Sequence, residues 1–285
     1  MASCDSRIMC VMSVQKEKAE LLRRLHHGPE ILVLPNAWDC ASARIFEEAG
    51  FSAIATTSAG VAFSMGYPDG ESIPQDEMLA VVKRIATCVK VPVTADLESG
   101  YRDIAKTTGA LIDSGAVGLN LEDMEHAESK VLAETGRQIE KITAVRRVAE
   151  GMGVKVVINA RTDVYLAQIG DAATRFERAC QRLRAYIDAG ADCVFLPGLT
   201  DEHTIRRVVE ALKFPVNILA TANAPTIARL EHLGVARVSV GSGVMRATIG
   251  LTRAIAAELK HEGTYSRMLE GAISYADANR LFENK

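Results

Sequence analysis

The sequence predicts an α/β fold, a (β/α)8 barrel of the TIM type, on three observations. Eight short apolar runs recur along the 285 residues, and segments with helical periodicity separate most of them. No Gly-x-Gly-x-x-Gly motif follows any run, which favours a barrel over a doubly wound sheet. Strands that are apolar on both faces and alternate with helices are typical of a parallel barrel. Four of the runs also follow a glycine at the end of a helical segment, where the left-handed cap suits it: Gly50, Gly115, Gly190 and Gly234.

The expected elements alternate in order along the chain. Strands are predicted at about residues 31–37, 53–58, 91–97, 117–123, 154–162, 193–198, 216–221 and 237–242. Helices are predicted at residues 39–48, 76–89, 139–152, 172–189, 202–212 and 224–233. Beyond the eighth unit, residues 265–282 are expected to form an additional amphipathic C-terminal helix.

The two ends of the chain are expected to differ. Residues 1–18 are predicted to be a disordered or irregular leader, because the apolar patch Ile8–Met12 is too short for a signal-peptide core. Residues 19–285 are then one (β/α)8 barrel domain with a C-terminal helical extension. This length is sufficient for a single large barrel.

Composition and charge exclude several classes of function. Hydrophobic residues make up 48% of the chain, and the net charge of −3 arises from acids and bases that are mixed along the sequence. Nothing resembles the basic stripe of a nucleic-acid-binding protein. No apolar run approaches the roughly 18–20 residues of a membrane span. A soluble cytoplasmic protein without a nucleic-acid or membrane partner is therefore predicted.

Three acidic side chains stand at the ends of predicted strands. Asp96 and Glu98 end the third strand and, being two positions apart, share one face. Glu122 ends the fourth strand. Three acids brought together repel each other unless a cation lies between them, and oxygen ligands favour Mg2+, with Mn2+ possible. The alternative is a structural hydrogen-bond network at the barrel rim.

Arg161 ends the fifth strand and is the natural partner for an anionic substrate. Its planar guanidinium binds a carboxylate or phosphonate through two hydrogen bonds. A rim salt bridge to one of the acids is the alternative. Asn120 and Asn159 lie two positions deeper on the same strand faces and can line the pocket floor. Residues 56–60, which close the second strand, are small, so their N–H groups can approach a ligand or simply allow tight packing.

Two connections are longer than the scaffold requires. Residues 59–72, rich in small side chains, follow the second strand, and the polar residues 124–136 follow the fourth. Both lie at the C-terminal ends of strands, where barrel active sites are built. The second connection is a candidate lid over the site. His126 within it is expected to be solvated and is assigned no role.

These residues together resemble the isocitrate lyase / phosphoenolpyruvate mutase superfamily over nearly the whole chain, from about Leu32. The metal motif of that superfamily, acid-x-acid-[Thr/Ser]-Gly-Tyr, is similar to residues 96–101. Its Glu-Asp pair after strand four matches Glu122-Asp123, and its strand-five arginine matches Arg161. The resemblance implies that Asp69 belongs to the outer coordination sphere of the metal. It further implies substrate-binding positions at Thr57, Ser58, Ala59, Asn120, Arg161 and Asn217.

The resemblance also carries expectations about chemistry and assembly. It implies a Mg2+-bound 2-oxo or 2-hydroxy acid and an enolate intermediate. It implies that the C-terminal helix is displaced or swapped between subunits, and that the protein is a homo-oligomer, a dimer or tetramer. With the metal, Arg161 would stabilise the oxyanion that develops as a bond to C3 breaks.

The chain departs from this superfamily where its subfamilies are distinguished. No cysteine lies between Cys88 and Cys180, so the catalytic thiol of isocitrate and methylisocitrate lyases is missing. Their strand-six glutamate is replaced by residues 196–198, Leu-Pro-Gly. The lysine and asparagine of the mutase loop are not recognisable in residues 124–136. The physiological substrate is therefore left open.

The leading prediction is a Mg2+-dependent lyase that cleaves a C–C bond of a small 2-oxo or 2-hydroxy (di)carboxylate, with Arg161 as the catalytic residue. Two alternatives remain. The first is a hydrolase or mutase that acts on the C–P bond of a phosphonopyruvate-type substrate. The second is a metabolite-binding barrel without catalysis.

Overall fold

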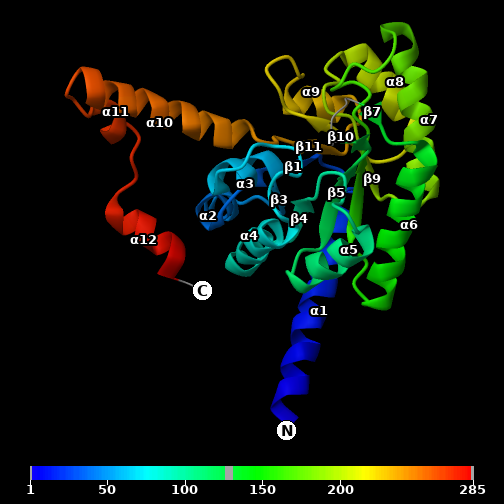
Figure 1. The fold of residues 1–285 in the computed structure, drawn as a ribbon, viewed down its shortest axis with the longest axis horizontal. Helices are drawn as coiled ribbons and strands as arrows, with labels where there is room; N and C mark the ends of the chain where they lie inside the picture. The colour runs from blue at the N-terminus through cyan, green and yellow to red at the C-terminus, as the bar shows by residue number, and fades with distance from the viewer. Residues whose placement is uncertain (1, 126–130, 284–285) are drawn as a thin grey trace.

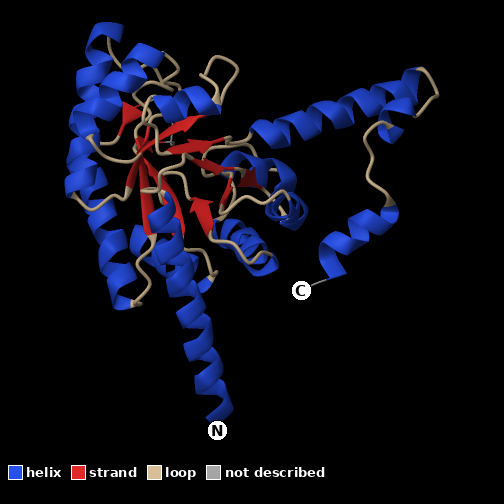
Figure 2. Cartoon of the chain, turned by 180° about the vertical axis from the view of Figure 1, so that it is seen from behind, coloured by secondary structure: helices blue, strands red, loops and turns tan. Residues whose placement is uncertain are grey.

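The computed structural model describes residues 2–125 and 131–283, and it has the predicted barrel of parallel strands surrounded by helices (Figures 1 and 2). Neighbouring strands of the main sheet pair in parallel, in the order β1-β11-β10-β9-β8-β5-β4-β3-β2. The eight predicted strands are confirmed at these bounds: β1 (Leu32–Leu34) with β2 (Asn36–Ala37), β3 (Ile54–Thr56), β4 (Val93–Asp96), β5 (Gly118–Glu122), β8 (Val157–Arg161), β9 (Cys193–Phe195), β10 (Val216–Leu219) and β11 (Arg237–Ser239).

The first strand closes the barrel because it pairs on both sides. Pro35, which has no N–H, divides it into β1, which pairs with β11, and β2, which pairs with β3. The buried side chain of Asn36 links both neighbours. Its Nδ2 donates to the Thr56 carbonyl (2.8 Å), and its Oδ1 accepts from the N–H groups of Val240 and Gly241 (both 2.9 Å).

Helices cover the outside of the barrel. They are α2 (Cys40–Glu48), α4 (Gln75–Cys88), α5 (Ile104–Asp113), α6 (Thr135–Gly151), α7 (Arg175–Asp188), α8 (Glu202–Leu212) and α9 (Ile227–His232). Six of them overlap the predicted helices, and α5 was not predicted. Asp39 begins α2 as predicted, since its carboxylate accepts from the Ser42 N–H at 2.7 Å. The prediction of a long connection over residues 59–72 is wrong in part. Its first residues belong to a further helix, α3 (Ser58–Met65), which is capped by Thr57.

The predicted irregular leader over residues 1–18 is corrected by the structure, in which Ala2–Leu25 form a helix, α1. Its C-terminal half packs against the N-terminal end of the barrel, where Ala19 and Leu22 are buried. The Gln15 side chain donates to the carbonyls of Ile112 (2.8 Å) and Ala116 (3.1 Å). Packing against the barrel, rather than any pattern in the short apolar patch, accounts for the order of this half.

The single predicted helix over residues 265–282 is also corrected. A long helix, α10 (Gly243–His261), leaves the barrel and is followed by α11 (Ser266–Leu269) and α12 (Tyr275–Glu283). The break between the last two contains Gly271, whose φ of +76° favours glycine. In Figure 1, α10 (orange) projects away from the barrel, and α12 (red) turns back towards α2. There the Arg44 side chain donates to the Leu281 carbonyl at 2.6 Å.

Two further observations concern predictions made above. Residues 124–136 contain two short antiparallel strands, β6 (Met124–Glu125) and β7 (Val131–Leu132), and the beginning of α6. The candidate lid residues 126–130, with His126, lie outside the described residues. Within the described part of the chain, no helix combines the length and the apolar character required to cross a membrane.

Candidate active site

Strand register brings the predicted site residues together inside the C-terminal mouth of the barrel. Asp96 of β4 pairs with Asn120 of β5, which pairs with Asn159 of β8. Glu122 pairs with Arg161 one layer higher. Paired residues of a parallel ladder share a face, so three strands present these side chains to the same interior space. The predicted convergence of Asp96, Asn120, Glu122 and Arg161 is therefore present in the structure.

Asp96 lies between the start of α3 and the floor of the mouth. Its Oδ2 accepts from both the N–H and the hydroxyl of Ser58, at 3.2 and 2.8 Å. On the other side, Asn120 Nδ2 lies 3.5 Å from Asp96 Oδ1. The Thr56 hydroxyl accepts from the Asp96 N–H at 2.9 Å and fixes the end of β4. The small residues after β3 thus lie against the acid rather than at a distance from it.

Glu98 is held in place by Glu71, a residue that the sequence reasoning did not single out. Both have left-handed backbones, with φ of +52°, an uncommon conformation for residues other than glycine. The Glu71 N–H donates to Glu98 Oε2 at 2.6 Å. In return, the Glu71 carboxylate accepts from the N–H groups of Ser99 and Tyr101 (both 3.0 Å) and from the Ser99 hydroxyl (2.7 Å). Glu71 therefore clamps the turn that carries Glu98.

The acids at this mouth repel one another. Burial, together with the charges of Asp96 and Glu122, raises the pKa of Glu98 to about 8. Asp96, Glu98 and Glu122 are all buried. Such a cluster favours the arrival of a positive charge, which would relieve the repulsion.

Arg161 lies beside these acids and is itself paired. Its Nε and Nη2 donate to the two carboxylate oxygens of Asp163 at 2.6 and 2.9 Å, and its Nη1 lies 2.6 Å from Glu122 Oε2. Burial alone lowers the pKa of Arg161, but Glu122 and Asp163 outweigh it and raise that pKa above its ordinary value. The rim ion pair, the alternative for Arg161, is thus present. A guanidinium has five N–H donors, so two others are left to serve a ligand.

The remaining predicted residues surround the acids less closely. Thr57 caps α3 by accepting from the Gly60 N–H at 3.2 Å, and Ala59 is buried in the first turn of that helix. Asp69 lies in the exposed connection before α4, where its charge still helps to raise the pKa of Glu98. Asn217 faces the interior of the barrel and pairs with the Ser239 hydroxyl at 2.9 Å.

The acids do not form a complete metal cage. Over the described ranges 2–125 and 131–283, no three His, Cys, Asp or Glu side chains converge closely enough to hold an ion between them. Each carboxylate instead contacts a different residue. Asp96 accepts from Ser58 and Glu98 from the Glu71 N–H, while Glu122 pairs with Arg161. Shared ligation of a cation would therefore involve water molecules or small side-chain rotations.

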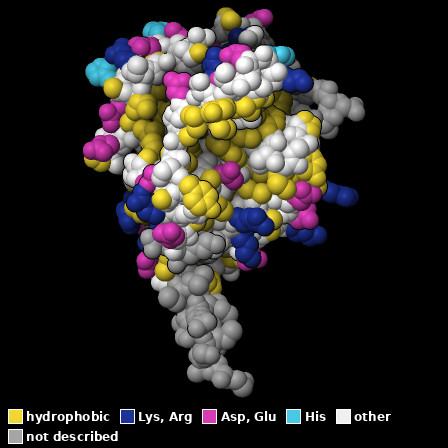
Figure 3. Space-filling view, turned by 90° about the vertical axis from the view of Figure 1, so that its left-hand side faces the viewer, with side chains coloured by type: hydrophobic (Ala, Val, Ile, Leu, Met, Phe, Trp, Pro, Cys, Tyr) yellow, Lys and Arg dark blue, Asp and Glu magenta, His cyan; other side chains and the backbone are white. Residues whose placement is uncertain are grey.

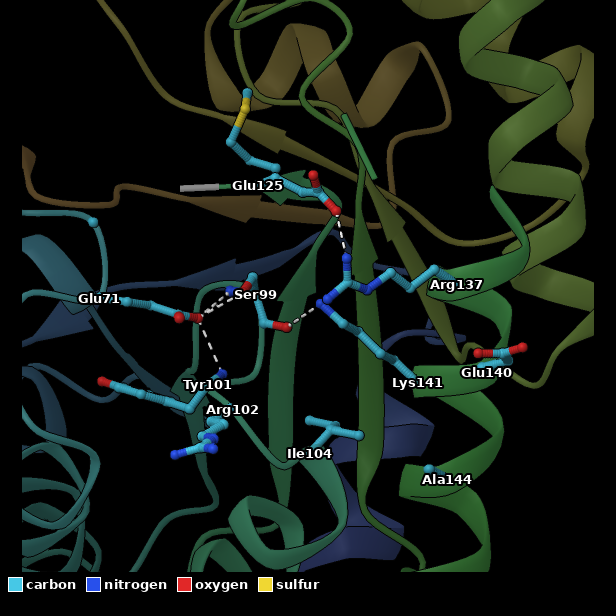
Figure 4. Close-up of a pocket in the computed structure, with 12 residues that line it drawn as sticks. Glu71, Ser99, Tyr101, Arg102, Ile104, Glu125, Arg137, Glu140, Lys141 and Ala144 are labelled. Atoms are coloured by element: carbon cyan, nitrogen blue, oxygen red, sulfur yellow. Dashed lines mark hydrogen bonds and ion pairs between the residues drawn. The ribbon is translucent and has the colours of Figure 1, made fainter. Parts of the chain in front are cut away.

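A pocket of about 850 Å3 lies on the outer side of the Glu98 turn (Figure 4). Ser99 of the turn and Glu71 beside it form one wall, and α6 forms the other. Lys141 bridges the two, since its Nζ donates to the Ser99 carbonyl at 2.7 Å. Asp96 and Arg161 do not line this pocket, which is therefore a neighbouring cavity rather than the acid site itself.

The sequence reasoning did not single out three residues that contact the candidate site, namely Asp163, Arg237 and Glu71. Asp163 follows Arg161 by two positions, so the spacing used for the acids indicates that it lies near Arg161. Arg237 interrupts the apolar run of the last strand, which is itself an unusual pattern. Glu71 gives no signal in the sequence, because its role depends on contact between two loops.

Comparisons with known proteins agree with this fold and indicate the family. The family model for phosphoenolpyruvate phosphomutase matches residues 22–260. The 2-methylisocitrate lyase of Bacillus subtilis is 30% identical, over 75% of this chain and 70% of the relative. A Burkholderia cenocepacia structure, provisionally assigned as a lyase/mutase, has a TM-score of 0.87 and 35% identity and covers 95% of this chain and 97% of that one. The structure of 2,3-dimethylmalate lyase has a TM-score of 0.82 and 28% identity, over 93% and 94% of the two chains.

Proposed function

The chain belongs to the phosphoenolpyruvate phosphomutase family, within the isocitrate lyase superfamily of enzymes, and from that premise we propose a divalent-metal-dependent carbon–carbon lyase. Its substrate in this proposal is a small 2-hydroxy or 2-oxo dicarboxylate. One observation carries the proposal: buried Asp96, Glu98 and Glu122 meet a permanently charged Arg161 at the mouth of the barrel.

The donor set at this mouth fits a hard divalent cation. Carboxylate oxygens are preferred by Mg2+ and Mn2+, and Mg2+ commonly keeps several waters. Asp96, Glu98 and Glu122 would hold the ion, in part through water, with Asp69 further out. The raised pKa of Glu98 supports this reading, because burial and two neighbouring acids disfavour its ionised form and a bound cation would favour that form. When bound, such a cation supplies Lewis-acid stabilisation of an oxyanion.

Arg161 would orient the substrate and stabilise negative charge at its carbonyl oxygen. Asp163 fixes the plane of the guanidinium through two hydrogen bonds, so the remaining N–H groups have a defined direction. A preorganised donor of this kind stabilises developing charge without reorganisation during the reaction. Arg161 is therefore proposed as the catalytic residue.

The start of α3 would bind a carboxylate group of the substrate. Backbone N–H groups at a helix N-terminus bind anions well. Ser58 already directs its N–H and its hydroxyl at a carboxylate, that of Asp96, at 3.2 and 2.8 Å. Thr57 and Ala59 flank it in the same turn. Asn120 and Asn217 would complete the floor of the site as neutral hydrogen-bonding groups.

Carbon–carbon cleavage is preferred over carbon–phosphorus chemistry because of the named relatives. The Bacillus subtilis relative and the dimethylmalate structure are both lyases by name. The missing cysteine separates this chain from thiol-dependent cleavage, so the proton donor must be another group. A substituted malate is therefore a better first substrate than isocitrate.

A substrate panel tests the proposal. The full chain is incubated with Mg2+ or Mn2+ and with malate, substituted malates, oxaloacetate and phosphonopyruvate, and release of 2-oxoacid is followed. The proposal predicts turnover of a carboxylate that EDTA abolishes. Turnover of phosphonopyruvate alone would establish the alternative C–P reaction. Tight oxalate binding without turnover of any compound would instead indicate a metabolite-binding barrel.

We further propose that the chain is a homo-oligomer, a dimer or tetramer, in which the C-terminal helices are exchanged. Hydrophobic side chains gather on the side of the molecule from which α10 projects (Figure 3). Among those exposed are Ile249, Leu251 and Leu259 of α10 and Leu269 of α11. An apolar pocket of about 570 Å3 between α2 and α10 offers space for a partner's helix. Light scattering of the full chain tests the assembly; the cytoplasmic location stays a prediction.

A further inference from the structure

Arg237 is a charged side chain inside the barrel, below the candidate active site. It lies on β11, where its register partners are Leu32 of β1 and Asn217 of β10, both facing the interior. Its exposed fraction is 0%, and it is the largest of the fully buried side chains among the described residues. Burial lowers the pKa of Arg237 to about 10, so the guanidinium still carries its charge at neutral pH.

The hydrogen-bond partners of Arg237 are neutral. Its Nη2 donates to Asn120 Oδ1 and its Nε to the Ser239 hydroxyl, both at 3.3 Å. Its Nη1 has no partner in the part of the chain that the structure describes. Among the described residues, no carboxylate lies within ion-pair distance of the Arg237 guanidinium. By contrast, Arg161 in the same barrel pairs with two carboxylates.

The neighbours of Arg237 supply no compensating charge from below. Burial raises the pKa of the Cys193 thiol to about 12, which keeps it protonated despite the guanidinium nearby. His26, which directly follows α1, is buried at the lower end of the barrel. Burial and the charge of Arg237 lower its pKa to about 4, so it is neutral as well. The nearest anion along the hydrogen bonds of Arg237 is Asp96, which it reaches through Asn120.

Two donors fix the orientation of Asn120. Asn159 Nδ2, at 2.8 Å, and Arg237 Nη2 both donate to Asn120 Oδ1. The NH2 end of this amide cannot face two donors, so it must point away from them. It points to Asp96. A chain of contacts therefore runs from Arg237 through Asn120 to the acid that is central to the candidate site.

A buried charge without an ionic partner destabilises a folded protein, and an apolar residue of similar size is often equally stable or better. Arg237 is thus expected to lower the stability of the fold, because no ion pair offsets the burial of its charge. Residues that reduce stability in this way are frequently retained for function. The position below Asp96 indicates what that function is.

We propose that Arg237 is a positioning residue of the active site: it fixes the Asn120 amide against Asp96 and holds a permanent positive charge beneath the site that favours dianionic ligands. The identity of the ligand rests on the proposed function. The fixed orientation of Asn120 does not. Because the charge is buried, its effect on ligands is screened little by salt.

The test compares Arg237→Met, Arg237→Lys and the control Arg146→Met, which replaces a partly buried arginine that pairs with Asp192 away from the site. Oxalate affinity is measured by calorimetry at saturating Mg2+, and unfolding by urea. In Arg237→Met, oxalate should bind about tenfold more weakly, while the free energy of unfolding is unchanged or higher. Arg237→Lys, which keeps the charge, should recover most of the affinity, and Arg146→Met should bind like wild type.

A crystal structure of Arg237→Met without metal separates this inference from the proposed function. The contact between Asn120 and Asp96 should break in it and remain in Arg237→Lys. If wild type binds no oxalate, the proposed function fails, and these structures alone decide the role of Arg237. An unmoved Asn120, or unchanged oxalate affinity in Arg237→Met, would overturn the inference. Failure of Arg237→Met to fold would also overturn it, since Arg237 would then be a structural residue.

Discussion

Glu122 and Asp123 are adjacent acids at the end of β5, yet they lie on opposite faces of the barrel wall. Asp123, on the outer face, is fully buried and well satisfied. Its Oδ2 accepts from the Thr162 hydroxyl (2.7 Å), Arg182 Nε (2.8 Å) and the Tyr186 hydroxyl (2.7 Å). Its Oδ1 accepts from the N–H of Asp163 at 3.0 Å.

The inner face has the opposite balance of charge. Glu122 pairs with Arg161, but Arg161 is shared with Asp163, and Asp96 and Glu98 add two more carboxylates. Glu98 shows the result, because burial and the neighbouring acids raise its pKa to about 8. Two acids that are neighbours in sequence thus have different surroundings: the outer one is satisfied by structural hydrogen bonds, and the inner one belongs to the acids that we propose as the ligand site. The following variants test that division.

The largest effect on stability is expected at the outer acid. Asp123→Ala removes the buried carboxylate that accepts from Arg182 and from three further donors. Removing one partner of a buried ion pair costs about 3–5 kcal/mol of unfolding free energy. Urea denaturation measures the loss, with Asp113→Ala, an exposed acid at the end of α5, as the control. A loss equal to that of the control would show that Asp123 does not stabilise the fold.

His26, at the lower end of the barrel interior, is expected to make the free energy of unfolding depend on pH. His26 has a folded-state pKa of about 4, below the ordinary 6.5, because burial and Arg237 disfavour its charged form. The unfolded state therefore binds more protons between these values. Stability is fully present above pH 6.5 and falls as the pH drops through 4, by roughly 3 kcal/mol. His26→Gln should flatten this part of the stability profile. The exposed neighbour variant His27→Gln should not, and equal profiles for all three proteins would contradict the assignment.

Arg161 tests the inner face directly. Arg161→Lys keeps a charge but loses the planar fork, so oxalate or oxoacid binding should weaken by about 100-fold, near 2.7 kcal/mol. Calorimetry at saturating Mg2+ measures the change. Arg146→Lys is the matched control, because Arg146 pairs with Asp192 away from the site. Wild-type affinity in Arg161→Lys would mean that Arg161 is only a rim ion pair.

A smaller effect is expected at the clamp behind Glu98. Glu71→Ala removes the acceptor of the Ser99 and Tyr101 N–H groups and should loosen the left-handed turn, with about tenfold weaker Mg2+ binding. Glu71→Gln keeps an acceptor oxygen and should stay near wild type. Hydrogen exchange of the two N–H groups reports the loosening. Unchanged exchange in Glu71→Ala would show that the turn holds its own conformation.

Much of this arrangement could be predicted from the sequence, because strand periodicity alone places residues on faces. The strand ends at Asp96, Glu122 and Arg161 were recoverable from apolar runs followed by charge, and parallel strands must bring such ends to one rim. The same reasoning could not supply Glu71, which acts through contact between two loops. Nor could it place α1, since packing against the barrel orders its second half. The break between α11 and α12 depends on the backbone of Gly271.

Direct measurement of metal binding to Asp96→Ala tests the central claim, that the inner acids form a divalent-cation site. Mn2+ binding to the metal-free chain is followed by electron paramagnetic resonance, beside wild type and Asp113→Ala. Wild type and the control should bind one Mn2+ per chain, and Asp96→Ala should lose this binding while its circular dichroism still reports a folded barrel. Undiminished Mn2+ affinity in folded Asp96→Ala would contradict the claim.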